Sequence, residues 1–88
     1  MDVIWDPAKA RANWKKHGIS FPDAEAVLWD HQALTREDPE AGAESRFVSL
    51  GLDSLGRVLV VVYAYEGDNI RLISARKASA GERRHYEK

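Results

Sequence analysis

The 88-residue sequence predicts an α+β fold of two layers, in which N-terminal helices pack on a mainly antiparallel sheet followed by a short C-terminal helix. Helix-capping residues are concentrated in residues 1–30, whereas β-favouring runs separated by short turns fill residues 44–77. The chain is also short, so residues 1–88 are expected to form one domain with a small core.

The first helix is expected over residues 7–17. Asp6 can serve as its N-cap, and Pro7 loses no hydrogen bond at the first helical position. Gly18 can adopt the left-handed conformation that ends many helices. The apolar residues from Val3 to Trp5 favour a short strand before the helix.

A second helix is expected to begin after Ser20 and to end near Trp29 or Asp30. Ser20 and Asp23 have the spacing of an N-cap and its third helical residue. One apolar stripe follows this helix and consists of Phe21, Ala24, Val27 and Leu28. Because tryptophan buries a large apolar surface, all three tryptophans are expected in the core: Trp5, Trp14 and Trp29.

The rest of the chain is typical of a β-meander. A short edge strand can form at residues 33–35, and three further strands are expected at residues 44–52, 57–66 and 70–77. The strand at 57–66 is apolar on both faces, which indicates a central position in the sheet. Ser79 and Glu82 have the spacing of a capping box, so a terminal helix is expected over residues 82–86.

Several classes of protein are excluded by composition. The chain has no cysteine, so neither a disulfide nor a thiolate metal site can form, and its three histidines match no metal-ligand spacing. We therefore expect no metal and no other cofactor. No apolar run is long enough to span a bilayer and the N-terminus does not resemble a signal peptide, so a cytoplasmic location without membrane contact is expected.

The net charge of −1 conceals an uneven distribution along the chain. Residues 1–20 carry four basic and two acidic side chains, and residues 71–88 carry six basic and two acidic ones. Residues 21–70 carry ten acidic side chains against three arginines. If the two basic ends meet in space, they form a positive surface that can attract nucleic acid or an acidic partner.

Four arginines lie within or at the ends of the expected strands: Arg46, Arg57, Arg71 and Arg76. Convergent guanidinium groups bind phosphates through paired, charge-assisted hydrogen bonds and stabilise the charge of a phosphoryl-transfer transition state. The alternative is that these arginines face solvent or pair with neighbouring acids. Arg71 and Arg76 are five residues apart, so they share one face only if a bulge intervenes.

Other side chains are candidates for proton transfer or base stacking. His17 suits acid–base chemistry because histidine titrates near neutral pH, although it can equally serve as a dipole-stabilised residue at a helix end. Glu44 can act as a base or as an ion-pair partner of Arg46. Tyr65 and Tyr86 can stack on nucleobases, and packing within the sheet is the alternative role of Tyr65.

Several strings along the chain together resemble one family of bacterial proteins. These strings are Trp5-Asp6-x-x-Lys9, Asn13-x-x-Lys16-His17-Gly18-Ile19-Ser20-Phe21, Glu44-x-Arg46, Gly56-Arg57, Arg71-x-Ile73-Ser74-Ala75-Arg76 and Glu82-Arg83-x-x-Tyr86. In this order they resemble the BrnT toxins of type II toxin–antitoxin systems, over nearly the whole chain.

The resemblance implies a RelE-like fold and a ribonuclease activity that arrests translation. It also implies a cognate antitoxin of the BrnA type, with two toxins and two antitoxins in a heterotetramer. Operator DNA would then be reached only through the antitoxin, and the basic stretch 71–88 is the expected antitoxin contact. No recognition helix for direct DNA binding is apparent in the sequence.

A metal-independent ribonuclease uses the ribose 2′-OH as nucleophile, and it needs a base, cations around the phosphate and a proton donor for the leaving oxygen. The expected catalytic residues are His17, Glu44, Arg46, Arg57, Arg71 and Arg76. The expected RNA-binding residues are Lys16, Tyr65, Arg83 and Tyr86. The alternative is a non-catalytic module that uses the same cations to bind RNA or a protein partner.

Overall fold

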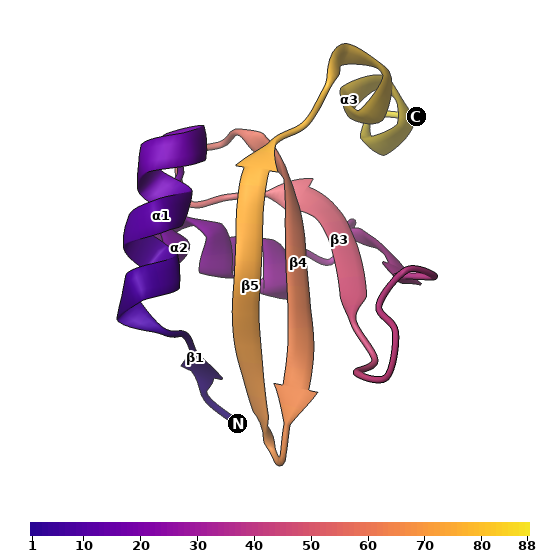
Figure 1. The fold of residues 1–88 in the computed structure, drawn as a ribbon. Helices are drawn as coiled ribbons and strands as arrows, with labels where there is room; N and C mark the ends of the chain where they lie inside the picture. Colours follow the sequence, from indigo (N-terminus) through magenta and orange to yellow (C-terminus); the bar gives the residue numbers. More distant parts are fainter.

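The computed structural model describes all 88 residues as one five-stranded sheet with the N-terminal helices on one face (Figure 1). The elements are β1 (Val3–Ile4), α1 (Pro7–His17), α2 (Phe21–Ala24), the 3₁₀ helix η1 (Glu25–Trp29), β2 (Leu34–Glu37), β3 (Phe47–Leu52), β4 (Val58–Glu66), β5 (Asn69–Lys77) and α3 (Ala80–Tyr86). The predicted α+β class and the order of the elements are confirmed.

The strand order in the sheet is β1-β5-β4-β3-β2. The predicted meander forms its antiparallel part, and β1 adds the only parallel pairing, with Val3 opposite Ile70 and Ile4 opposite Arg71. The short strand β1 makes the sheet one strand wider than the meander, and β2 at the other edge is the predicted edge strand. None of the helices is long and apolar enough to cross a membrane.

The predicted helix ends are confirmed by their hydrogen bonds. The Asp6 carboxylate accepts from the Ala8 N–H at 2.8 Å, and Gly18 has a φ of 68° and ends α1. The predicted second helix is α-helical only in α2, and the rest of its span, up to Trp29, forms the 3₁₀ helix η1. The capping box of Ser79 and Glu82 is present, and α3 begins at Ala80, two residues before the predicted start.

The main core lies between the helices and one face of the sheet. The helical layer contributes Ile19, Phe21, Ala24 and Val27, which pack against the buried side chains Leu59, Val61, Tyr63, Ile70, Leu72 and Ala75 of β4 and β5. The prediction of three core tryptophans is wrong for Trp14 and Trp29, which are 61% and 53% exposed. Only Trp5 packs against the core, edge-on to Phe21 at 5.9 Å between ring centres.

Asn13 explains why Trp14 lies outside the core. The side of α1 that faces β5 carries Asn13, which is 6% exposed, and the next residue along the helix is rotated away from the sheet. The Asn13 amide donates to the carbonyls of Ile19 and Ala75 at 3.0 and 2.9 Å and accepts from the Ala75 N–H at 3.0 Å. β1 pairs only with Ile70 and Arg71, so no strand lies beside Ala75 on this edge of β5. The Asn13 amide forms the hydrogen bonds to Ala75 that a neighbouring strand would form.

The opposite face of the sheet is covered only in part. A smaller apolar cluster of Leu50, Val60 and Ala78 lies there, with Tyr86 of α3 packed against it. No residue of α3 is buried, and the helix lies beyond one end of β5 rather than across the strands (Figure 1). We call this side of the sheet the open face.

Candidate functional site

A β-bulge brings Arg71 and Arg76 to the same face of β5. Val62 of β4 pairs with Ser74, whereas the next residue, Tyr63, pairs with Leu72, so Ile73 is an extra residue in β5. The bulge reverses the alternation of side chains between the two arginines. Arg71 lies opposite Ala64 and Arg76 opposite Val60, both on the open face. The sequence analysis required a bulge between Arg71 and Arg76 for the two side chains to share one face, and the structure contains this bulge.

Arg71 and Arg46 share the carboxylate of Glu44. The Arg71 Nη2 donates to both carboxylate oxygens of Glu44, at 2.9 and 3.0 Å, and its Nε lies 3.3 Å from Glu66. The Arg46 Nε lies 3.6 Å from Glu44 and is buried without a hydrogen-bond partner. Three of the predicted catalytic residues thus form one group, which we call the Glu44 cluster.

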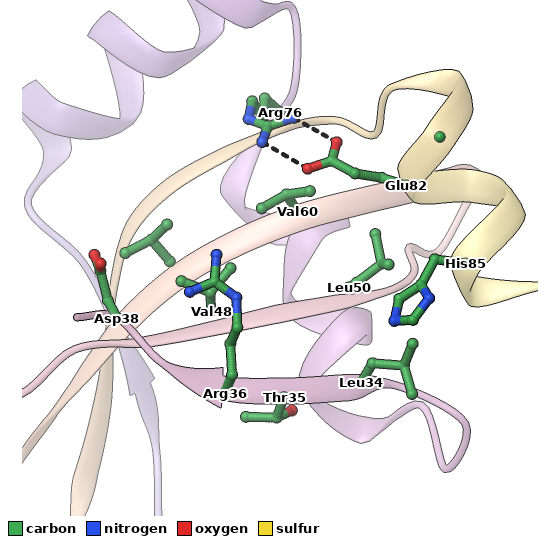
Figure 2. A pocket seen from close by; sticks show the side chains of 12 residues that line it. Leu34, Thr35, Arg36, Asp38, Val48, Leu50, Val60, Arg76, Glu82 and His85 are labelled. Carbon is green, nitrogen blue, oxygen red and sulfur yellow. Dashed lines mark hydrogen bonds and ion pairs between the residues drawn. The ribbon is translucent and has the colours of Figure 1, made fainter. Parts of the chain in front are cut away.

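A hollow of about 570 Å³ lies on the open face between β2 and α3 (Figure 2). Its floor consists of aliphatic side chains from β3 and β4, namely Val48, Leu50, Val60 and Val62. One wall comes from β2 and the residue after it, and it contains Leu34, Thr35, Arg36 and Asp38. The other wall comes from β5 and α3, and it contains Arg76, Gly81, Glu82 and His85. We call this feature the β2–α3 hollow.

Arg76 and Glu82 form a paired ion bridge at the rim of the β2–α3 hollow. The Arg76 Nη1 and Nη2 donate to the two carboxylate oxygens at 2.9 and 3.0 Å, and the Ser79 N–H donates to the same carboxylate at 2.8 Å. The bond from Arg76, and then the bond from Ser79, lower the pKa of Glu82 to about 2. The bond to Glu82 raises the pKa of Arg76. Glu82 is therefore an acceptor, not a proton donor, near neutral pH.

Arg36 is the arginine that the sequence analysis missed. Its strand, β2, pairs Arg36 with Val48, so the side chain lies on the open face and extends over the floor of the hollow (Figure 2). Unlike Arg46, Arg71 and Arg76, it forms no ion pair with a carboxylate. The sequence did contain a signal for this position. Arg36 follows Leu34 by two residues in an edge strand, and alternation puts two such side chains on the same face of the sheet.

The structure does not bring Arg57 to the open face. Its Nε donates to the buried Asp53 carboxylate at 2.8 Å, and its Nη2 lies 2.7 Å from Asp53 and 3.8 Å from Asp23. Asp53 also accepts from the Arg57 N–H at 2.8 Å, so the pair closes the turn between β3 and β4. The sequence could have predicted this pairing, because Asp53 lies only four residues before Arg57 in the same turn.

Lys16, His17 and Tyr65 lie away from the open face. The first two are in the last turn of α1, which packs on the other side of the sheet. Tyr65 shares its face of β4 with the buried Tyr63 and packs edge-on against Phe47 at 5.4 Å. The imidazole on the open face is that of His85, which the sequence analysis passed over because the histidines showed no common spacing.

Tyr86 holds α3 to the rest of the molecule. Its hydroxyl donates to the Asp30 carboxylate, and this bond, together with burial, raises the pKa of Tyr86 to about 12. Burial alone would raise the pKa of Asp30, but hydrogen bonds from Tyr86 and from the Leu52 and Gln32 N–H groups hold it below its usual value. Arg83, also on α3, donates to the Ala78 carbonyl at 3.4 Å.

Replacing Tyr86 by phenylalanine is expected to lower the free energy of unfolding by about 1 kcal/mol, because a hydrogen bond to a partly exposed carboxylate is lost while the ring remains. Urea unfolding measures this change. Tyr65→Phe is the control, since the Tyr65 hydroxyl lies on an exposed side chain, and it should unfold like the unmodified protein. Equal stability of Tyr86→Phe and the unmodified protein would show that this bond does not hold α3.

The open face therefore offers guanidinium groups, carboxylates and one imidazole above an aliphatic floor. Nowhere in the structure do three or more histidine, aspartate or glutamate side chains come together as a metal site. Four guanidinium groups on one face can bind the phosphates of an extended ligand and stabilise additional negative charge on one of them.

Comparison with known proteins places the chain in a family. The family model for the ribonuclease toxin BrnT of type II toxin–antitoxin systems matches residues 5–82, which include all four arginines of the open face. The crystal structure of the Brucella abortus ribonuclease toxin BrnT is similar, with a TM-score of 0.67 and 28% sequence identity over 90% of this chain and 97% of that one. No curated protein sequence matches at a significant level. The chain belongs to the BrnT family of type II ribonuclease toxins.

Proposed function

We propose that this protein is an endoribonuclease toxin with a RelE-like fold that cleaves RNA on the open face without a metal ion and so arrests translation. The observation that carries the proposal is the β-bulge at Ile73, which puts Arg71 and Arg76 on one face with Arg36 and Arg46. Membership of a family of ribonuclease toxins supports RNA as the substrate.

The reaction begins when a ribose 2′-OH attacks the adjacent phosphorus. The P–O5′ bond then breaks, which leaves a 2′,3′-cyclic phosphate and a free 5′-OH. A base takes the 2′ proton, and the leaving oxygen receives one. The extra negative charge on the phosphate is greatest in the transition state, where fixed guanidinium groups stabilise it most.

The Glu44 cluster can supply both the cations and the base. A phosphate that takes the place of Glu44 beside Arg71 would accept the charge-assisted hydrogen bonds that the carboxylate accepts now from the Arg71 Nη2. It would also offer an acceptor to the buried Arg46 Nε, which has no hydrogen-bond partner. The released carboxylate would lie next to the bound phosphate, where it can accept the 2′ proton. His17, at the end of α1, has no place in this arrangement.

A cognate antitoxin of the BrnA type is the partner that we propose, in an assembly of two toxins and two antitoxins that alone contacts operator DNA. Membership of a type II toxin–antitoxin family supports an antitoxin partner. Arg83 and Arg84 on α3 are exposed and basic, so an acidic antitoxin segment is expected to contact them. The same surface serves a non-catalytic binding module equally well, and a cleavage assay distinguishes the two functions.

The purified protein should cleave single-stranded RNA in excess EDTA and leave 2′,3′-cyclic phosphate ends, which mass spectrometry identifies. A substrate with 2′-deoxyribose at the cleaved position should remain intact, because the attacking hydroxyl is absent. RNA binding without cleavage would support the non-catalytic module instead. Cleavage that EDTA abolishes would contradict the metal-independent chemistry.

A further inference from the structure

The β2–α3 hollow has a chemistry that cleavage at the Glu44 cluster does not use. Its floor is aliphatic, and Val48 and Val62 on this floor are only half-buried. Arg36 and Arg76 lie on opposite walls. A ligand that matches both features has a flat apolar face and negative charge on either side of it.

The pairing register shows how the cations lie relative to the floor. Arg36 pairs with Val48, Val48 with Val62, and Val62 with Ser74, so one row of residues crosses the sheet from β2 to β5. Arg76 lies in the next row, opposite Val60. Three strand spacings separate β2 from β5, or about 14 Å, so the floor is wide enough for one flat ring between the two cationic walls.

The Glu44 cluster lies at the other end of the same face. Arg71 and Arg76 pair with Ala64 and Val60, which are four residues apart on β4, so about 13 Å separates the two positions along the strand. One phosphate therefore cannot account for both ends of the face. A chain of nucleotides that crosses it would put one phosphate at the Glu44 cluster and the neighbouring nucleotide over the hollow.

We propose that the β2–α3 hollow is a nucleobase subsite, in which one unstacked base of the RNA lies on the floor of Val48 and Val62 and its flanking phosphates bind Arg36 and Arg76. This proposal rests on the proposed ribonuclease function, and it names the part of the RNA that binds in the β2–α3 hollow. The volume of about 570 Å³ lies within the range of small-ligand sites. Sequence-specific RNA recognition is typically directed at such unstacked bases.

The Arg76–Glu82 bridge gives the rim of the subsite its polar groups. Glu82 stays ionised, with a pKa of about 2, and its Oε2 accepts only from Arg76, so this oxygen can accept a further bond from a base N–H. Arg36 has no carboxylate partner to displace when it binds a phosphate. On the β2 side, Arg36 is therefore free to bind a phosphate. On the α3 side, Glu82 can distinguish between bases by the N–H groups that they offer.

Binding of nucleoside 5′-monophosphates to the unmodified protein tests the subsite without any cleavage. Each of the four monophosphates and ribose 5-phosphate is titrated while the methyl signals of Val48, Val60 and Val62 are followed by NMR. The base should tighten binding about tenfold over ribose 5-phosphate, because it buries apolar surface against the aliphatic floor, and it should shift these methyl signals. Equal affinity for the two ligand classes, no binding of the monophosphates, or shifts confined to other residues would overturn the proposal.

A variant pair then connects the subsite with RNA cleavage. Val62→Asn puts a polar group on the floor, and it should raise KM for RNA about tenfold with little change in kcat. Leu55→Asn makes the same kind of change at a 64% exposed turn residue outside the hollow, and it should leave both constants unchanged. If Val62→Asn does not fold, Val48→Asn replaces it. An unchanged KM in a folded floor variant would overturn the proposal, whereas absence of cleavage by the unmodified protein would overturn the proposed function and leave the binding test decisive for the subsite.

Discussion

Replacing Arg71 by alanine is expected to lower kcat/KM for RNA cleavage by about 100- to 1,000-fold, which is the usual effect of removing one preorganised donor to a transition-state anion. Arg71 is the arginine with the most carboxylate contacts on the open face, since it binds both oxygens of Glu44 and also contacts Glu66. In the proposed mechanism, a phosphate takes the place of the Glu44 carboxylate beside this guanidinium group. Cleavage of a fluorescent RNA in excess EDTA measures the effect.

Arg57→Ala is the matched control for Arg71→Ala. It also removes an arginine side chain at the end of a strand, but this side chain does not lie on the open face. The loss of its contacts with Asp53 should lower the free energy of unfolding, while RNA cleavage by the folded protein stays within about threefold of the unmodified rate. Arg71→Lys should lie between the two variants, since lysine keeps the charge but lacks the planar guanidinium group whose Nη2 and Nε contact Glu44 and Glu66 at once. Full cleavage by Arg71→Ala, or a larger loss in Arg57→Ala, would exclude the open face as the site of cleavage.

Replacing Asn13 by alanine is expected to lower the free energy of unfolding by about 3 kcal/mol or more. The Asn13 amide satisfies three backbone groups, and each buried group left without a partner costs about 1–3 kcal/mol. The site lies between α1 and β5, where the short strand β1 leaves the edge of the sheet unpaired. Urea unfolding followed by circular dichroism gives the free energy directly.

Trp14→Ala is the control for Asn13→Ala, because it changes a larger side chain on the neighbouring position of the same helix. Trp14 is 61% exposed, so its removal should change the free energy of unfolding by less than about 0.5 kcal/mol. If truncation of the tryptophan destabilises the protein more than truncation of the asparagine, the assignment of Asn13 as the link between α1 and β5 is wrong.

The sequence predicted well the features that short-range chemistry determines. The caps at Asp6 and Ser20, the left-handed Gly18 and the capping box of Ser79 and Glu82 each depend on residues within four positions of one another. Such signals are fully contained in a short stretch of chain, which explains why the helix starts and the end of α1 were predicted to within two residues, whereas the change from α2 to the 3₁₀ helix η1 was not predicted.

The candidate site was predicted only in part because its geometry depends on pairing between distant strands. The bulge at Ile73 becomes visible only when β5 is aligned with β4, although the spacing of Arg71 and Arg76 already showed that a bulge was required. Arg36 joins the site because β2 pairs with β3, and Arg57 leaves it because Asp53 competes for its guanidinium group. Residue type alone could not separate these two arginines.

The acid–base candidates show the same limit. His17 and His85 are indistinguishable as isolated histidines, and the fold puts them on opposite sides of the sheet. Tyr86 looked available for stacking, but the Asp30 carboxylate, 56 residues away in sequence, holds its hydroxyl. Contacts over such a distance in the chain follow from the packing of α3 on the sheet.

A crystal structure with an RNA that carries 2′-deoxyribose at the cleaved position is the most direct test of the proposed function. The deoxy substitution prevents cleavage, so the intact strand can be observed in place. The account predicts that the uncleaved phosphate lies within hydrogen-bond distance, about 3 Å, of the Arg71 guanidinium, with the Glu44 carboxylate displaced beside it. An RNA bound instead on the helix-covered side, next to Lys16 and His17, would contradict the account.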